Sequence, residues 1–334
     1  MYIKNKERVI SPFLFPKKYF LQICKKMLTA QQMCVIILNV DSSTILKMYI
    51  WRRRMIKIVT DSTTDLPKDI RKRVTIVPLI ISFSGEQFVD GLDISKQEFY
   101  ERLVECTELP TTSQPSPLSF EGVFKDAKKK GDKVVCITLS SKLSGTYQSA
   151  KIAMEGYEDT VSLIDSRSAA IGTGILVEMA VKMAEKGESA ERIAEMITAE
   201  RDNICVVAML DTLEYLKKGG RISRLSAFAG GILSIKPVIC IRNGEIEILG
   251  KARGSKNGNN LLIKEIESAG GVDFTKPLLL GYTGLSDALL QKYIKDSSFL
   301  WDEHLDELRT VLVGSVIGTH IGPGGIAVAF FKKS

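Results

Sequence analysis

The sequence has little of the chemistry that metal sites and disulfide frameworks need. It contains only two histidines, His304 and His320, and its six cysteines form no Cys-x-x-Cys pair. A structural zinc site uses four Cys or His ligands, so we expect neither a metal site nor a cofactor. A chain of 334 residues buries enough apolar surface to fold without disulfides. Free cysteines then indicate a reducing environment, and we expect a cytoplasmic protein.

Long apolar segments and nucleotide-binding motifs are also missing. A membrane-spanning helix needs ~20 consecutive apolar residues, and no such segment occurs, so no transmembrane segment is expected. There is no phosphate-binding loop of the form G-x-x-x-x-G-K-S/T, and Gly172-Thr173-Gly174 lacks the third glycine of a dinucleotide fingerprint. The G-x-S-x-G elbow of many serine hydrolases is absent too. We therefore expect that the chain has no ATP site of its own.

The net charge of +7 comes from one end of the chain. Residues 1–54 hold eleven Lys and Arg against two acids, which gives 11 − 2 = +9, so the remaining 280 residues carry 7 − 9 = −2. A nucleic-acid-binding domain should carry its excess positive charge on the folded part. The sequence therefore argues against DNA or RNA as a partner.

The basic segment 1–54 has two interpretations. Aromatic residues beside lysines favour an amphipathic element at a membrane surface. Alternatively, the segment is non-native or disordered, because Trp51-Arg52-Arg53-Arg54 back-translates to a purine-rich string that resembles a ribosome-binding site just before Met55. We favour the second interpretation and expect the folded protein to begin at Met55.

Strand and helix signals alternate from Met55 onward, which is typical of an α/β protein. We expect an N-terminal α/β domain over residues 55–203 and a C-terminal α/β domain over residues 204–334. Residues 75–83 are rich in Ile and Val and are predicted to form one strand. Ser95 is the expected N-cap of a helix. Asn243-Gly244, between two apolar segments, predicts a two-residue hairpin turn.

Polar residues and a glycine follow the predicted strands at several points, among them Asp61, Ser62, Ser144, Gly145 and Thr146. A predicted polar loop over residues 111–116 adds Thr112 and Ser113. Ligands of an open parallel sheet bind beyond the carboxyl ends of its strands, where the N–H groups of helix N-termini suit an anion. Ser, Thr and Asp are also the preferred helix caps. The pattern alone therefore leaves both a small-anion or carboxylate site and simple capping open.

His320 is the histidine of a glycine-rich segment, residues 318–325, that is predicted to be a loop packed closely on a ligand. An imidazole can activate a serine hydroxyl, so His320 with Ser144 or Ser113 is a candidate nucleophile and base pair. The plainer interpretation is a histidine that is hydrogen-bonded in a turn.

Seven sequence blocks resemble the DegV family, in order and over essentially all of residues 55–334. They are IVTDS at 58–62, TSQPS at 112–116, LSGTYQSA at 143–150, LDTLEYLKKGGRI at 210–222, KP at 236–237, KARG at 251–254 and HIGPG at 320–324. The resemblance implies a two-domain α/β fold with a parallel sheet in the N-terminal domain and a mixed sheet in the C-terminal domain. It also implies that a fatty acid lies between the two domains.

The resemblance implies roles for particular residues as well. The fatty-acid carboxylate would be held by Thr112 and Ser144, with His320 near the same head group. A separate ATP-binding kinase would phosphorylate the bound fatty acid to an acyl phosphate for phospholipid synthesis, and Arg221 and Arg253 are candidates to meet that kinase. Further head-group candidates are Ser113, Gly145, Thr146, Asp61 and Ser62.

Two other functions stay open at this point. One is a Ser/His-type esterase or hydrolase that uses Ser144 and His320, which would turn over a fluorogenic ester. The other is a regulatory protein in which a lipid is a structural plug, which would exchange its lipid slowly or not at all.

Overall fold

The computed structural model describes residues 55–222 and 235–333. The predicted extension 1–54 lies outside the described residues, so both interpretations of it stay predictions. Within the described part of the chain, no helix is long and apolar enough to cross a membrane.

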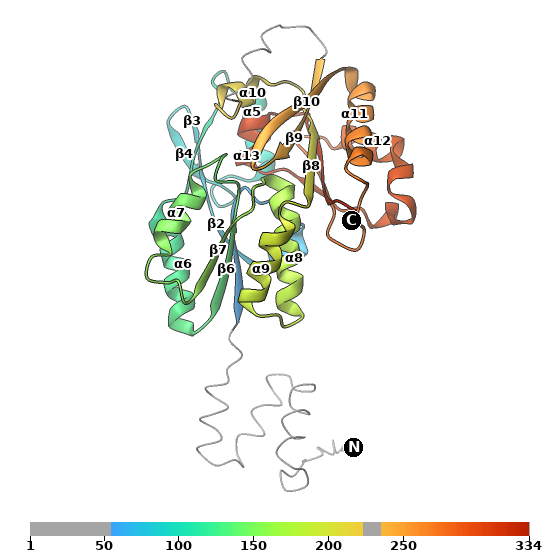
Figure 1. Cartoon of the computed structure of the whole chain (residues 1–334). Helices are drawn as coiled ribbons and strands as arrows, with labels where there is room; N and C mark the ends of the chain where they lie inside the picture. Colours follow the sequence, from blue (N-terminus) through green and yellow to red (C-terminus); the bar gives the residue numbers. More distant parts are fainter. Residues whose placement is uncertain (1–54, 223–234, 334) are drawn as a thin grey trace, which may run out of the picture. The chain divides into compact units, whose positions relative to one another are not determined.

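A four-stranded parallel sheet is formed by the chain before residue 203, as the sequence predicts. Its strand order is β2-β1-β6-β7. The strands are β1 (Ile56–Asp61), β2 (Val74–Val77), β6 (Lys133–Thr138) and β7 (Val161–Asp165), and α4 (Lys68–Arg71) connects the first two. Neighbouring residues of a strand point to opposite faces. Val59 accordingly packs under α6 (Pro117–Lys130) and α7 (Thr146–Ala153), whereas Ile58 packs under α8 (Ala170–Glu185) and α9 (Ala190–Glu200) (Figure 1).

A small antiparallel sheet interrupts this part of the chain. It consists of β3 (Ile80–Phe83), β4 (Glu86–Val89) and β5 (Thr111–Ser113), in the order β4-β3-β5. The prediction of one strand over residues 75–83 is therefore wrong, because β2 and β3 belong to different sheets. Pro78 lies between them and has no N–H to continue a ladder. Helix α5 (Lys96–Glu105) follows β4, and Ser95 Oγ caps it by accepting from Glu98 N at 3.1 Å, as predicted.

The chain after residue 203 forms a six-stranded mixed sheet. Its order is β10-β9-β8-β13-β11-β12, and every neighbouring pair is antiparallel except β11 and β12. The strands are β8 (Ile204–Met209), β9 (Ile235–Arg242), β10 (Glu245–Arg253), β11 (Leu279–Tyr282), β12 (Thr310–Leu312) and β13 (Ile326–Phe331). The turn at Asn243-Gly244 joins β9 to β10, and both residues have positive φ (50° and 81°), as a type I′ hairpin requires.

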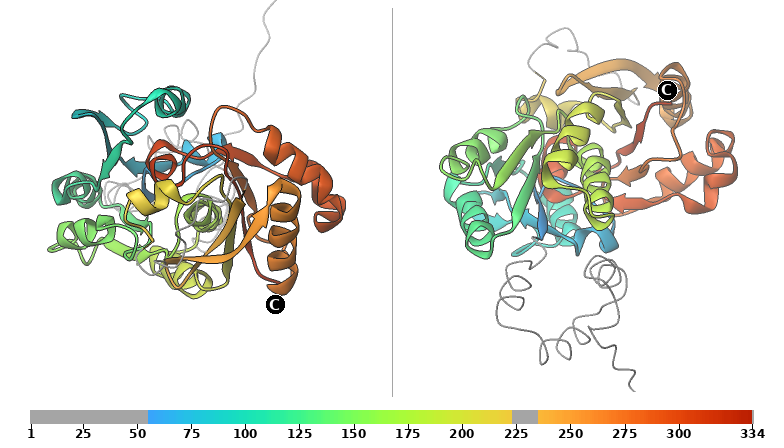
Figure 2. Two further views of the ribbon diagram at one scale, coloured as in Figure 1. Left: turned by 90° about the horizontal axis from the view of Figure 1, so that it is seen from above. Right: turned by 60° about the horizontal axis from the view of Figure 1, so that its bottom comes forward.

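Helices cover the mixed sheet unequally. One face is covered by α11 (Gly254–Ser268) and α12 (Ala288–Asp296), followed by the 3-10 helices η4 (Ser298–Leu300) and η5 (Asp302–Glu307) (Figure 2). The opposite face meets α8 and two short helices, α10 (Glu214–Lys218) and α13 (Ser315–Ile321). The prediction that His320 lies in a loop is wrong, because His320 belongs to the last turn of α13, which ends at Gly322 with φ 72°.

Helix α8 joins the two large sheets. Ten of its 16 residues are buried, and six of these pack in one cluster with Ile58 of the parallel sheet and with Val206 and Ala329 of the mixed sheet. A helix that is apolar on all sides belongs in a core rather than at a surface. The proposed boundary near residue 203 falls between α9 and β8, where the chain passes from one sheet to the other.

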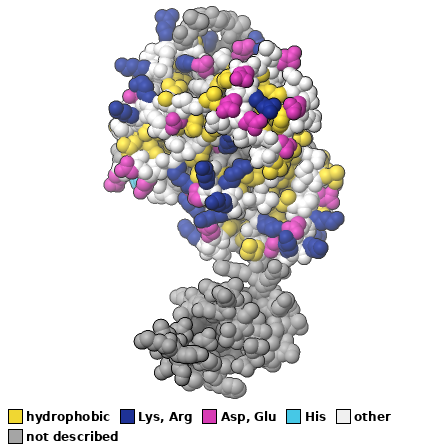
Figure 3. Space-filling view, turned by 180° about the vertical axis from the view of Figure 1, so that it is seen from behind, with side chains coloured by type: hydrophobic (Ala, Val, Ile, Leu, Met, Phe, Trp, Pro, Cys, Tyr) yellow, Lys and Arg dark blue, Asp and Glu magenta, His cyan; other side chains and the backbone are white. Residues whose placement is uncertain are grey.

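The outer surface mixes both signs of charge. On the face shown in Figure 3, acidic side chains lie among the basic ones, and one group of Lys and Arg gathers near the middle. This mixture agrees with the net charge of −2 for residues 55–334.

Candidate functional site

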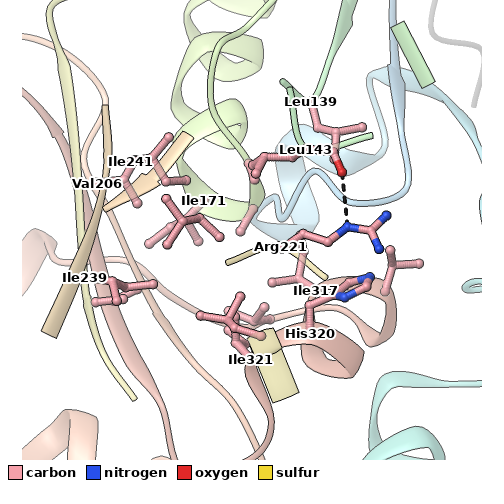
Figure 4. Close-up of a pocket in the computed structure, with 18 of the residues that line it drawn as sticks. Leu139, Leu143, Ile171, Val206, Arg221, Ile239, Ile241, Ile317, His320 and Ile321 are labelled. Carbon is pink, nitrogen blue, oxygen red and sulfur yellow. Dashed lines mark hydrogen bonds between the residues drawn. The ribbon is translucent and has the colours of Figure 1, made fainter. Parts of the chain in front are cut away.

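An apolar cavity lies between the strand ends of the parallel sheet and one face of the mixed sheet. Of its 23 lining residues, 19 are apolar and four are polar. The polar residues are Thr112, Ser144, Arg221 and His320. Figure 4 shows His320 and Arg221 together at one end of the cavity, and Ile171, Val206, Ile239 and Ile241 at the other. The cavity has a volume of about 100 Å³.

Thr112 and His320 form a direct hydrogen bond at the polar end. Thr112 Oγ1 lies 2.8 Å from His320 Nε2, although 208 residues separate them in the sequence. Pairing of β5 with β3 places Thr112 opposite Ile81, and the last turn of α13 carries the imidazole. The sequence predicts both residues for the head-group site, and the structure brings them into contact.

Ser144 reaches the cavity from the loop between β6 and α7. Its Oγ lies 2.9 Å from Thr146 Oγ1 and accepts from Thr146 N at 3.3 Å. Between them Gly145 packs so closely on Gln114 that a Cβ there would require the Gln114 amide to shift. Gln114 Nε2 also donates to Ser149 Oγ at 2.9 Å. These contacts tie the loop that carries Ser144 to the segment that carries Thr112.

Arg221 is the charged residue of the cavity lining. Its Nε donates to Leu143 O at 3.3 Å and its Nη1 to Gly219 O at 2.5 Å, which fix the guanidinium beside the imidazole (Figure 4). The sequence points to Arg221 as a residue that meets a kinase, and the structure places it in the wall of the cavity. A single cation in an otherwise apolar lining is the feature that marks Arg221 as a binding residue, because a ligand with an anionic end needs a positive charge there.

The electrostatics of the polar end favour an anion. Burial, and then the charge of Arg221, lower the pKa of His320 from 6.5 to about 4, so the imidazole is neutral at pH 7. Its Nδ1 is buried without a hydrogen-bond partner in the described chain, and a Cβ on Gly219 would overlap it. A neutral imidazole, two hydroxyls and one guanidinium carry a net charge of +1. That charge complements a single carboxylate.

The hydrolase alternative lacks its catalytic pair in this arrangement. His320 is hydrogen-bonded to Thr112, and Ser144 to Thr146, whereas no hydrogen bond joins His320 to a serine within the described residues. Ser113 is exposed and lies outside the cavity lining. A nucleophilic serine requires a base within hydrogen-bonding reach.

The other predicted head-group residues hold loops rather than the cavity surface. Asp61 Oδ2 accepts from Leu139 N at 2.8 Å, and Ser62 Oγ accepts from Leu79 N at 3.0 Å. Leu139 and Leu79 both line the cavity, so Asp61 and Ser62 position its wall from behind. Asp61 is fully buried, and burial raises the pKa of its carboxyl group.

Two further predictions concern a kinase contact and a metal. Arg253 is exposed at the end of β10, where its carbonyl accepts from Asn257 Nδ2 at 2.9 Å, and it does not line the cavity. Within the described ranges, no group of three or more His, Cys, Asp or Glu is arranged to hold a metal ion.

Comparisons with known proteins agree with the fold. The model of the DegV family of uncharacterised proteins matches residues 55–333. A DegV domain-containing protein of Caldanaerobacter subterraneus is 38% identical over 283 residues, which cover 83% of this chain and 99% of that protein. A second relative, from Clostridium acetobutylicum, is 34% identical over 284 residues, with coverage of 83% and 99%.

Solved structures give the same assignment. A DegV family protein of Thermus thermophilus, described by its fatty-acid binding, superposes with a TM-score of 0.75 at 33% identity, over 84% of this chain and all of that one. A stearic acid-binding protein of Eubacterium ventriosum gives a TM-score of 0.70 at 31% identity, with coverage of 83% and 99%. The Fatty Acid Kinase (Fak) B3 protein of Streptococcus pneumoniae, loaded with linoleic acid, gives 0.72 at 25% identity, with coverage of 84% and 100%. This chain therefore belongs to the DegV family.

Proposed function

We propose that the chain binds one long-chain fatty acid in the apolar cavity and presents its carboxylate to a separate ATP-dependent kinase. The observation that carries this proposal is the polarity of the cavity lining. It has 19 apolar residues, whereas Thr112 is hydrogen-bonded to His320 and Arg221 lies beside His320 at one end (Figure 4). A molecule with one anionic end and a long aliphatic tail matches that division.

The apolar lining supplies the affinity in this proposal. Removing ~16 methylenes from water at ~0.8 kcal/mol each gives a gross gain of ~13 kcal/mol. Lost translational freedom and ordering of the chain offset much of that gain. The lining is apolar on both the α8 side and the mixed-sheet side, so the part of the tail inside the cavity is withdrawn from water.

The polar end supplies orientation. The hydroxyls of Thr112 and Ser144 donate to the carboxylate, and Arg221 balances its charge. Because the one proton of the Thr112 hydroxyl then goes to the carboxylate, His320 donates its Nε2–H to Thr112 Oγ1 and holds that hydroxyl in place. The fatty-acid-loaded Fak B3 protein of Streptococcus pneumoniae supports both the ligand class and the kinase partner. Phosphorylation would take place in the cytoplasm, where ATP is available.

The test reconstitutes the reaction from its parts. Delipidated protein, palmitate, ATP and the candidate kinase of the same organism are mixed, and each is omitted in turn. Acyl phosphate, trapped as the hydroxamate, is expected only when all four are present. Acyl phosphate formed without the kinase would contradict the carrier role and make this chain an enzyme.

Two further readouts separate the other functions. Hydrolysis of a fluorogenic ester that disappears in Ser144→Ala would establish the esterase instead. Bound lipid that does not exchange with added palmitate would establish a structural plug. If the reaction needs both proteins, His320→Ala is expected to lower turnover more than fatty-acid affinity, because charge builds up at the carboxylate only during transfer.

A further inference from the structure

A second pocket lies where β8 and β9 part. Pairing between these strands stops at Val207 and Cys240, although β8 begins at Ile204 and β9 continues to Arg242. A pocket of about 380 Å³ lies at this parting, between the end of α9, the end of α11 and the last residues of the chain. The C-terminus is held there because Lys332 N donates to Asn203 O at 3.0 Å (Figure 1). We call this cavity the basic pocket.

The lining of the basic pocket is rich in positive charge. It contains four basic and two acidic residues, which give a formal charge of 4 − 2 = +2. These residues are Arg167, Arg201, Arg242, Lys332, Asp202 and Glu265. Residues 55–334 as a whole carry −2, so this concave surface has the sign opposite to that of the folded part around it.

Two of the four cations are neutralised locally. Arg167 Nη1 lies 3.1 Å from Asp202 Oδ1, and Arg242 pairs with Glu265. The other two, Arg201 and Lys332, have no carboxylate partner among the described residues. Arg201 Nη1 donates to Asp165 O at 2.9 Å, and Lys332 Nζ donates to Asp202 O at 3.1 Å. Arg201 Nε is buried and has no acceptor in the described chain. Hydrogen bonds to backbone carbonyls therefore keep Arg201 and Lys332 at the pocket, although neither side chain is paired with a carboxylate.

We propose that the basic pocket binds a small phosphate monoester. A guanidinium with one N–H anchored to a carbonyl keeps further N–H groups for an oxyanion, and phosphate is the oxyanion whose charge of about −2 at pH 7 matches a lining of +2. The pocket is larger than a phosphate ion, so the organic part of the ester has room beside Ile204 and Ala269.

This site is separate from the proposed fatty-acid site. The two cavities share Cys240 and Ile241 as part of their walls, but they share none of their polar residues. A phosphate monoester in the basic pocket would therefore not need Thr112, Ser144, Arg221 or His320. Its binding can be tested whether or not the chain carries a fatty acid.

Binding is measured by ³¹P NMR line broadening with glycerol 2-phosphate as the monoester and inorganic phosphate as the smaller probe. We expect both probes to bind the full chain, the monoester more tightly, and both more weakly as the salt concentration rises. Lys332→Ala is expected to weaken binding about tenfold, which is the usual cost of one charge-assisted hydrogen bond. Arg201→Lys keeps the charge but loses the guanidinium edge, and we expect a similar loss.

Matched variants decide the assignment. Lys333→Ala removes the same charge one residue further on, at an exposed side chain outside the pocket, and should leave the affinity unchanged. Thr112→Ala should leave it unchanged as well. The proposal is overturned if the intact chain binds neither probe, or if Lys332→Ala and Lys333→Ala weaken binding equally. Melting temperatures of all variants show that a loss of binding is not a loss of fold.

Discussion

The chain before residue 203 and the chain after it build the apolar cavity in different ways. The first part contributes eight lining residues, which lie at strand ends, in loops and at the start of α8. The second contributes 15, most of which lie along β8, β9, β10, β13 and α13. Each part also supplies two of the polar residues: the hydroxyls of Thr112 and Ser144 from the first, and Arg221 and His320 from the second. The polar residues thus come from β5, two loops and α13, while the mixed sheet and α13 supply most of the apolar wall.

The largest expected effect comes from placing a charge on the sheet side of the cavity. Ile246 lines the cavity from β10, an edge strand, and is only partly buried, so the fold should tolerate a substitution there. In Ile246→Asp the acyl tail would bury a carboxylate without a partner, and we expect palmitate affinity to fall more than about a hundredfold. Displacement of a fluorescent fatty acid measures it. Ile246→Leu is the matched control. If Ile246→Asp binds palmitate as tightly as Ile246→Leu, β10 does not contact the acyl tail.

His320 gives a pH dependence that belongs to the polar end. Its pKa is lowered from 6.5 to about 4 in the folded protein, so between these values the unfolded chain binds a proton that the folded chain does not. The free energy of unfolding should therefore decrease as the pH falls from 6.5 to 4, by at most about 3 kcal/mol. In His320→Asn this part of the pH-dependent decrease in the free energy of unfolding should be absent.

Urea unfolding at pH 7, 5.5 and 4, followed by circular dichroism, compares the variant with the intact protein. His304→Asn, which changes the other histidine of the chain, is the control. A difference between His320→Asn and the intact protein that stays constant with pH would mean that His320 titrates normally.

The two hydroxyls, Thr112 on β5 and Ser144 on the loop before α7, are expected to have intermediate effects. Thr112→Ala and Ser144→Ala each remove one hydrogen bond to a charged group, which corresponds to about a tenfold to hundredfold loss of palmitate affinity. Ser113→Ala is a matched control, because Ser113 neighbours Thr112 on β5 but is exposed and outside the lining. Unchanged affinity in the double variant would place the carboxylate elsewhere.

The smallest expected effect separates the two arginines that the sequence groups together. Arg221 lines the cavity and Arg253 does not, so Arg221→Gln should weaken palmitate binding about tenfold while Arg253→Gln leaves it unchanged. Isothermal titration of the delipidated proteins measures both. Equal effects would show that Arg221 acts only through the overall charge.

Local rules predict the parts of this fold that depend on neighbours in the sequence. The hairpin at Asn243-Gly244 and the capping of α5 by Ser95 both follow from the conformational preferences of single residues, and both are present. The single strand over 75–83 fails because Pro78 divides an apolar segment whose halves join different sheets. The glycines around His320 predict a loop, yet its segment is helical and packs on α5 and α10.

Prediction of the site from neighbouring residues in the sequence is limited in the same way. Thr112 and Ser144 come from the family resemblance and both line the cavity, whereas the 19 apolar residues around them are ordinary core residues in the sequence. Nothing local distinguishes Ile239, which lines the cavity, from Val238 beside it, which packs under α11 on the other face of the sheet. Only the arrangement of the two sheets around α8 decides which residues face the ligand.

The central claim is that the cavity holds a long-chain fatty acid, and the lipid carried by the purified protein tests it most directly. Full-length protein made in bacteria is extracted with organic solvent, and the extract is quantified by mass spectrometry against the protein concentration. We predict one long-chain fatty acid per chain in the intact protein and substantially less in Ile246→Asp. Well-folded intact protein that yields no stoichiometric fatty acid, and that takes up none when palmitate is added, would contradict the account.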